Sequence, residues 1–133
     1  MDVLRNMVDA VTPGGIVLDL QVVRPNPIVE VDGRQSCEID GEPLFRWADA
    51  ASAAVDALVV AGHLVEEAVE DHDVRKHYVN GAELVDDFAD NERRLPDAAL
   101  PGLRAVARPC AVRERCRLRR LSVRGGALER VAL

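Results

Sequence analysis

The chain has 133 residues and a mass of 14.5 kDa, which suits one domain and excludes two independent catalytic domains. Apolar residues make up 48% and charged residues 30% of the sequence, which is typical of a folded globular protein and excludes a disordered or collagen-like chain. The net charge is −6, and an aromatic content of 3% supplies too few rings for a base-stacking surface, so we expect no nucleic-acid partner.

The three cysteines form no Cys-x-x-Cys pair, and their odd number favours a reducing compartment. The N-terminus lacks the basic segment and apolar run of an export signal. The longest apolar stretch, near residues 57–61, is far too short to span a bilayer. We therefore expect a cytoplasmic protein with no membrane partner.

The first predicted elements are a short helix and a buried strand. Apolar residues repeat at helical spacing over residues 3–11, and Thr12-Pro13-Gly14-Gly15 ends that helix. Residues 16–23 (IVLDLQVV) follow at once and are apolar on both faces except for Asp19 and Gln21. That composition predicts a central parallel strand covered on both sides.

An excursion and a second helix come next. Residues 24–43 begin with Arg-Pro-Asn-Pro and contain two Asp-Gly pairs, which predict one or two small hairpins. Residues 48–62 carry their apolar side chains on one helical face and end at a glycine, so they predict a helix. Phe45 and Trp47 start this helix and are expected in the core, with a lid over a hydrophobic substrate as the alternative.

The remaining elements are two strands and short helices. Residues 64–78 predict an acidic strand, and Asn80 with Glu83 predicts a capped helix after it. A broken helical turn is expected around Pro101. Residues 110–123 alternate between apolar and arginine side chains, and a slip in that alternation at residues 119–120 predicts a bulge.

Charge is unevenly distributed along the chain. Residues 1–102 hold 8 basic and 21 acidic side chains, whereas residues 103–133 hold 9 basic and 2 acidic ones. Because the arginines alternate within a predicted strand, we favour their pairing with the acidic strand over a phosphate-binding patch. The residues expected to face one another are Glu66, Glu67, Glu70, Asp71 and Asp73 on one strand and Arg113, Arg115 and Arg117 on the other.

The Pro-Gly-Gly turn at residues 11–20 (VTPGGIVLDL) carries a resemblance to a known family. With the crossover helix and the closing strands, it resembles the C-terminal half of a class I, Rossmann-like S-adenosylmethionine-dependent methyltransferase. Residues 48–62, 64–78 and 110–123 are similar in order and type to that family's next helix and its sixth and seventh strands. The resemblance implies an α/β fold over residues 1–133, with a parallel strand, a crossover helix and a closing antiparallel strand pair.

What the resemblance implies about function is methyl transfer from S-adenosylmethionine to a small-molecule acceptor. The family's first four strands and its glycine-rich cofactor loop have no counterpart here, and no catalytic or cofactor-binding residue can be named. The alternative is a non-catalytic interaction or assembly module derived from that fold, which binds no cofactor. A third possibility is a small α/β binding domain unrelated to methyltransferases.

Four residues are candidates for binding a substrate. Arg24 and Asn26 leave the carboxyl end of the predicted parallel strand, where ligands bind in open α/β sheets. Asn26 is faintly similar to the start of the Asn-Pro-Pro-aromatic motif of amino-group methyltransferases, although Ile28 stands where the second proline would be. His77 and Tyr78 end the strand similar to the family's sixth. The alternatives are a loop stiffened by proline, an edge histidine and a packed tyrosine ring.

The sequence Asp71-His72-Asp73, with His77 nearby, could suggest a metal or a general base. On a strand, however, neighbouring side chains point to opposite faces, so His72 cannot converge with its two neighbours without a turn. We therefore expect no metal site.

The strand over residues 16–23 also predicts a partner. Residues 110–123 could protect one of its edges, and the other edge would be bare. An apolar strand with an unpaired edge is a template for association. We expect a homodimer, or a missing N-terminal half, to pair there.

Overall fold

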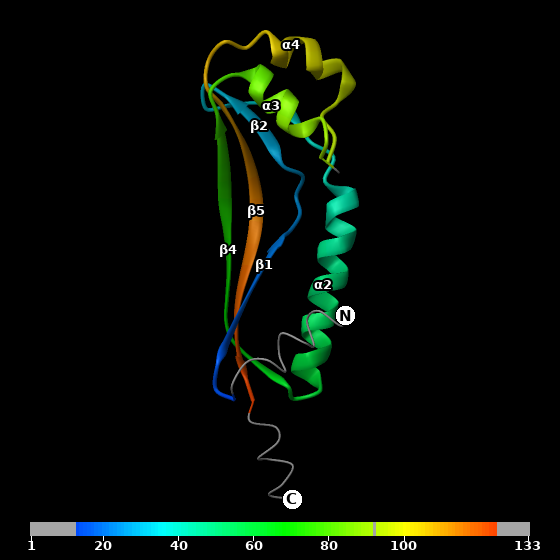
Figure 1. Ribbon diagram of the computed structural model, residues 1–133, viewed down its shortest axis with the longest axis vertical. Coiled ribbons are helices and arrows are strands. Elements are labelled where there is room, and N and C mark those ends of the chain that lie inside the picture. Colours follow the sequence, from blue (N-terminus) through cyan, green and yellow to red (C-terminus); the bar gives the residue numbers. More distant parts are fainter. Residues whose placement is uncertain (1–12, 92, 125–133) are drawn as a thin grey trace, which may run out of the picture. The chain divides into compact units, whose positions relative to one another are not determined.

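The computed structural model describes residues 13–91 and 93–124, which form five antiparallel strands and three α-helices (Figure 1). The strand order is β1-β5-β2-β3, and β4 also pairs with β5. The elements are β1 (Ile16–Val22), β2 (Ile28–Val31), β3 (Arg34–Glu38), α2 (Glu42–Val60), β4 (Leu64–Tyr78), α3 (Gly81–Phe88), a 3₁₀ turn (Asp97–Ala99), α4 (Leu100–Arg104) and β5 (Cys110–Val123).

The prediction of a parallel strand with a crossover helix is wrong. β1 pairs with β5 in the antiparallel sense: the Gly14 amide donates to the Val123 carbonyl at 2.8 Å, and the Val23 amide donates to the Arg115 carbonyl at 2.9 Å. The apolar composition of residues 16–23 misled the prediction, because it reports hydrophobicity and not the direction of the neighbouring strand. The helix predicted over residues 3–11 lies outside the described residues.

The chain divides into two compact units, and α2, β4 and β5 contribute to both. In the described residues, the first unit comprises residues 13–21, 48–71 and 117–124. The second unit comprises residues 22–47 and 72–116, except residue 92. Each unit has its own cluster of buried hydrophobic side chains.

In the first unit, α2 covers one face of the strands. Val55 of α2 packs with Val17 of β1, Leu64 of β4, and Leu121 and Val123 of β5. The side chains at these positions all point toward the helix, so their neighbours along each strand point to the opposite face.

No helix among the described residues is long and apolar enough to cross a bilayer.

The bounds of α2 differ from the prediction at one end only. Its C-terminal stop is confirmed: Gly62 has φ +83°, and its amide donates to the Val59 carbonyl at 3.1 Å. Its N-terminus lies at Glu42, earlier than predicted, where the Glu42 amide donates to Asp40 Oδ1 at 3.1 Å. Pro43 is compatible with this start because the first turn of a helix needs no amide donor there.

A buried arginine also joins three elements of the first unit. The side chain of Arg119 on β5 is only 9% exposed, and its Nη2 lies 2.8 Å from Asp56 Oδ1 of α2 and 2.6 Å from Glu66 Oε2 of β4. Burying a guanidinium is costly unless carboxylates neutralise and hydrogen-bond it. The helix and both strands are therefore held in one arrangement around this charge.

In the second unit, β2 and β3 form the predicted hairpin. Asp32 and Gly33 occupy its turn with φ +52° and +73°, the conformation that an Asp-Gly pair favours. β2 also pairs with β5, with Val29 opposite Val112. Phe45 is buried as expected, but Trp47 is exposed, so its assignment to the core is wrong.

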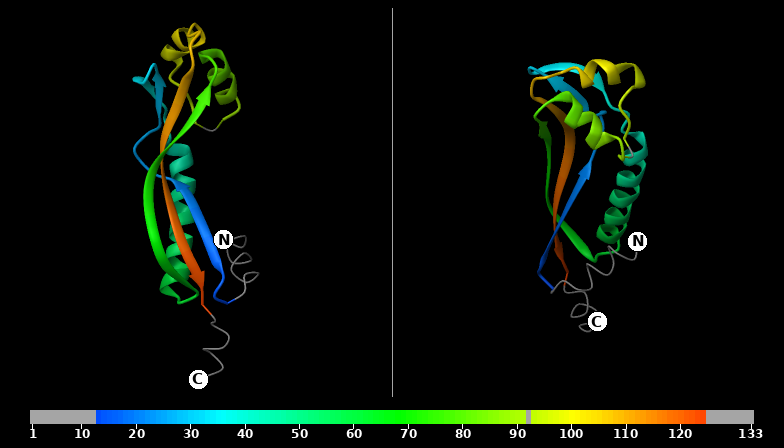
Figure 2. Two further views of the ribbon diagram at one scale, coloured as in Figure 1. Left: turned by 90° about the vertical axis from the view of Figure 1, so that its left-hand side faces the viewer. Right: turned by 45° about the horizontal axis from the view of Figure 1, so that its top comes forward.

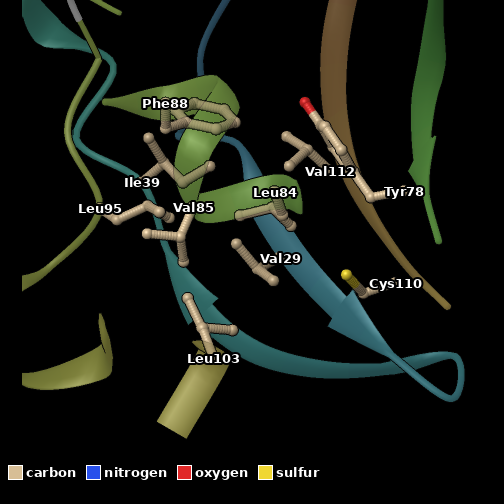
Figure 3. Close-up of a cluster of buried hydrophobic side chains, with 10 residues drawn as sticks. All are labelled: Val29, Ile39, Tyr78, Leu84, Val85, Phe88, Leu95, Leu103, Cys110 and Val112. Carbon is tan, nitrogen blue, oxygen red and sulfur yellow. The ribbon is translucent and has the colours of Figure 1, made fainter. Parts of the chain in front are cut away.

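The core of the second unit lies under α3 and α4 (Figure 3). Asn80 caps α3 as predicted, because its Oδ1 accepts a hydrogen bond from the Glu83 amide at 2.9 Å. The broken helical turn around Pro101 is also confirmed, as a 3₁₀ turn followed by α4. The core residues are Val29, Ile39, Tyr78, Leu84, Val85, Phe88, Leu95, Leu103, Cys110 and Val112.

The alternation of β5 changes phase between Cys116 and Arg119, slightly before the slip that the sequence predicts at residues 119–120. Apart from the small Ala111, the buried residues are even-numbered up to Cys116 and odd-numbered from Arg119 onward. A shift of one residue moves every following side chain to the other face. This one strand therefore supplies side chains to both buried clusters.

Gly81 tests the packing of α3 against α4. A Cβ at this position would lie 1.7 Å from the Leu103 carbonyl oxygen, whereas a Cβ at Gly102 of α4 would meet nothing within 4 Å. Gly81→Ala should lower the free energy of unfolding by about 2 kcal/mol or more, and Gly102→Ala should leave it unchanged or raise it by up to about 1 kcal/mol. Urea unfolding measures both, and equal effects would contradict this packing.

Arg119 provides a second test of the fold. Arg119→Ala removes a buried side chain with its charge-assisted hydrogen bonds to the partly exposed Asp56 and Glu66, and should lower the free energy of unfolding by about 2 kcal/mol. Arg120→Ala removes the exposed pair with Glu67 and should cost less than about 1 kcal/mol. Thermal and urea unfolding of the two variants should differ clearly, and a similar small cost for both would rule out a central role for Arg119.

Candidate functional site

The predicted substrate residues Arg24 and Asn26 hold a loop in place. The Arg24 Nη2 lies 2.9 Å from Glu42 Oε1, and its guanidinium lies 5.0 Å from the centre of the Phe45 ring. Asn26 Oδ1 accepts a hydrogen bond from the Gly41 amide at 3.1 Å. Both side chains therefore fasten the segment before β2 to the start of α2.

The other two predicted residues, His77 and Tyr78, point to opposite faces of β4. Tyr78 is buried in the core of the second unit, whereas His77 is exposed and lines a cavity of about 380 Å³ beside Asp32 and Arg75. Asn26 lines two other cavities, which share no lining residue with the cavity of His77. The structure therefore does not bring the four predicted residues into one site.

The tyrosine has a structural role. Its hydroxyl donates to Asp87 Oδ2 at 2.6 Å, and Lys76 Nζ lies 3.0 Å from the same oxygen. Burial, followed by the hydrogen bond to Asp87, raises the pKa of Tyr78 far above its usual value. The hydroxyl of Tyr78 and then the ammonium of Lys76 lower the pKa of Asp87. This tyrosine thus stays protonated and joins β4 to α3.

The three thiols lack the features of a reactive nucleophile. Burial raises the pKa of Cys37, Cys110 and Cys116, which is the opposite of the change that activates a cysteine. Among the described residues, no group of three His, Cys, Asp or Glu side chains is placed to hold a metal ion.

The described residues do not fit the cofactor that the methyltransferase resemblance implies. In open α/β sheets such a ligand binds across the carboxyl ends of parallel strands, beside a glycine-rich turn. The strands described here are all antiparallel, so no such crevice is formed by them. Methyl transfer from S-adenosylmethionine stays a prediction.

The electrostatic prediction for the two long strands is confirmed. β4 runs beside β5 (Figure 2), and Arg117 makes two hydrogen bonds with Asp71, at 2.8 and 3.0 Å. Arg115 Nη1 lies 3.3 Å from Asp73 Oδ1. The acidic and basic strands therefore neutralise each other, as their composition predicts.

A network of charges continues across the second unit. Glu30 of β2 lies 3.0 Å from Arg75 Nε and 3.3 Å from Arg113 Nε. The hydrogen bond from Arg75 is the main reason that the pKa of Glu30 is lowered, and Arg113 adds to it. Glu30 therefore stays ionised, and it joins β2 to both long strands.

The first unit exposes an apolar face that the sequence analysis placed in the core. Val17 and Leu64 point toward α2, so the alternate residues of β1 and β4 lie on the opposite side. We call this side the outer face. Its apolar residues, with their exposed fractions, are Ile16 (38%), Leu18 (61%) and Leu20 (57%) of β1, and Val65 (37%) and Val69 (48%) of β4.

β1 also has a free edge. In the described part of the chain its only neighbour is β5, so every second amide and carbonyl of β1 points away from the sheet. The carboxylate of Asp19 on this strand has a buried Oδ2 without a hydrogen-bond partner, while its Oδ1 accepts from the Gln21 amide at 2.8 Å. An apolar outer face and an open edge thus occur on one strand, whereas Asp19 lies on the opposite side of it, with Val17.

Comparison with models of protein families, with curated proteins and with solved structures finds no match for the chain. Its function is therefore argued from its own surfaces, among which the outer face brings together five exposed apolar side chains beside the free edge of β1.

The link between Tyr78 and Asp87 leads to a prediction about pH. Tyr78→Phe should raise the pKa of Asp87 toward that of an ordinary carboxyl group, since the hydroxyl is the main cause of its lowering. The stability that Asp87 contributes is present above the carboxyl pKa of the unfolded chain and is lost as the pH falls through the lower, folded value. A carboxyl NMR titration measures the shift, and an unchanged pKa of Asp87 would refute the link.

Proposed function

We propose that the chain is a non-catalytic assembly module that pairs with a second copy of itself along the free edge of β1. The observation that carries this proposal is the exposed apolar side of an edge strand, formed by Ile16, Leu18 and Leu20. Large apolar residues on an open edge are a template for another strand.

The free edges of the described sheet differ in the number of charged side chains that they carry. β1 has a single charged residue, Asp19, in its seven positions. β3 is bounded by Arg34 and Glu38, and the edge of β4 is rich in carboxylates. Charged side chains are the usual protection against pairing between sheet edges, and like charges on two copies of β4 would repel. Of the described edges, β1 is therefore the one suited to a second strand.

A two-fold pairing suits this edge. An antiparallel contact between two β1 strands is closed, so it gives a dimer and no open-ended filament. It sets Leu18 and Leu20 of each copy beside those of the other and joins the two outer faces.

The test is the oligomeric state of the purified chain by sedimentation equilibrium. Wild-type protein should be dimeric at about 100 µM. Leu18→Lys should shift it to monomer, because an ammonium group on the outer face opposes pairing. Val60→Lys is the matched control: Val60 is 89% exposed at the end of α2 and is not part of β1 or the outer face, so its variant should stay dimeric.

Circular dichroism of Leu18→Lys checks that the variant is folded, which we expect because Leu18 is already mostly exposed. A wild-type monomer at about 100 µM would overturn the proposal. So would a folded Leu18→Lys variant that dimerises as strongly as the wild type.

A further inference from the structure

A polar cavity in the second unit is independent of the β1 edge. It has a volume of about 350 Å³, at the low end of the range for small-molecule sites. Its polar lining comes from the loop before β2, the β2–β3 hairpin, β4 and β5. The polar residues are Asn26, Gln35, Glu38, Asp73, Arg113 and Arg115.

The strand side of this cavity has an excess of positive charge. Glu30 pairs with Arg75 and Arg113, and Asp73 lies 3.7 Å from Arg113 and 3.3 Å from Arg115. The three guanidinium groups of this network therefore share only the two carboxylates of Glu30 and Asp73. Arg115 uses only Nη1 in this network, which leaves guanidinium N–H groups for another acceptor.

The hairpin side carries an unneutralised carboxylate. Glu38 has no ion-pair partner among the described residues, and its hydrogen bond from Asn26 Nδ2 is long, at 3.5 Å. Gln35 also lines the cavity, and its side-chain amide has no hydrogen-bond partner in the part of the chain that the structure describes. Both side chains are exposed, so a ligand that pairs with them replaces the water that hydrates them.

We infer that this cavity binds a small zwitterion, an α-amino acid, between these two sides. Its carboxylate would be held by Arg115 and Arg113, which suit planar acceptors. Its ammonium group would pair with Glu38, and a polar side chain would find the amide of Gln35. A simple anion satisfies the arginines but is repelled by Glu38, so recognition requires both charges.

Calorimetric titration of the full chain with L-glutamine tests this inference. Two analogues test the two charged groups of the ligand one at a time. N-acetyl-L-glutamine lacks the ammonium group, and L-glutaminamide lacks the carboxylate. L-Glutamine should bind with a dissociation constant of about 1 mM or tighter, and each analogue should bind at least about tenfold more weakly. No binding of L-glutamine at about 10 mM, or equal binding of all three, would overturn the inference.

Variants then locate the site. Glu38→Gln and Arg115→Gln should each weaken L-glutamine binding about tenfold, the loss expected for one charge-assisted contact. Arg108→Gln is the matched control, because Arg108 pairs with Asp32 on the exposed surface outside this cavity and its variant should bind normally. Equal binding by Glu38→Gln and wild type would refute the site. Because these residues lie outside β1, the outcome is independent of dimerisation.

Discussion

The pairing of β5 with its neighbours is the constraint on which the described structure depends. This strand hydrogen-bonds to β1, to β2 and to β4. Its arginines meet the carboxylates of β4, as in the two hydrogen bonds between Arg117 and Asp71. Exposed ion pairs of this kind contribute only about 0.2 to 1 kcal/mol each. Their value lies in register, because a slip by one residue would set charges against the core and turn every apolar side chain outward.

The same strand carries both buried clusters, which explains its unusual pattern. Cys110 and Val112 belong to the core under α3 and α4, and Leu121 and Val123 belong to the core under α2. In a strand that packs against a single core, such a change of phase would turn the apolar side chains that follow it away from that core. In β5, this change of phase lets a single strand supply apolar side chains to the buried cluster of each unit. It also places Arg119 beside its two carboxylate partners in the first unit.

The two proposed activities use surfaces of opposite chemistry. The edge of β1 is apolar and nearly uncharged, which suits the non-directional contact and backbone pairing of a second copy. The cavity beside Glu38 and Arg115 is lined by charges that the protein does not fully neutralise, which suits a small polar ligand. Neither surface needs an activated nucleophile, in keeping with the raised pKa values of the three thiols.

The sequence by itself determined the features that depend on near neighbours or on complementary composition. The Asp32-Gly33 turn, the Asn80 cap and the stop at Gly62 each follow from the conformational preference of a few residues. The pairing of acidic and basic strands follows from their opposite charges. Only the tertiary structure decided the direction of the partner of β1, the exposure of Leu18, and the charges around the cavity. A strand's hydrogen-bond partner and the side of it that is covered are set by segments distant in sequence, and apolar composition is the same in either arrangement.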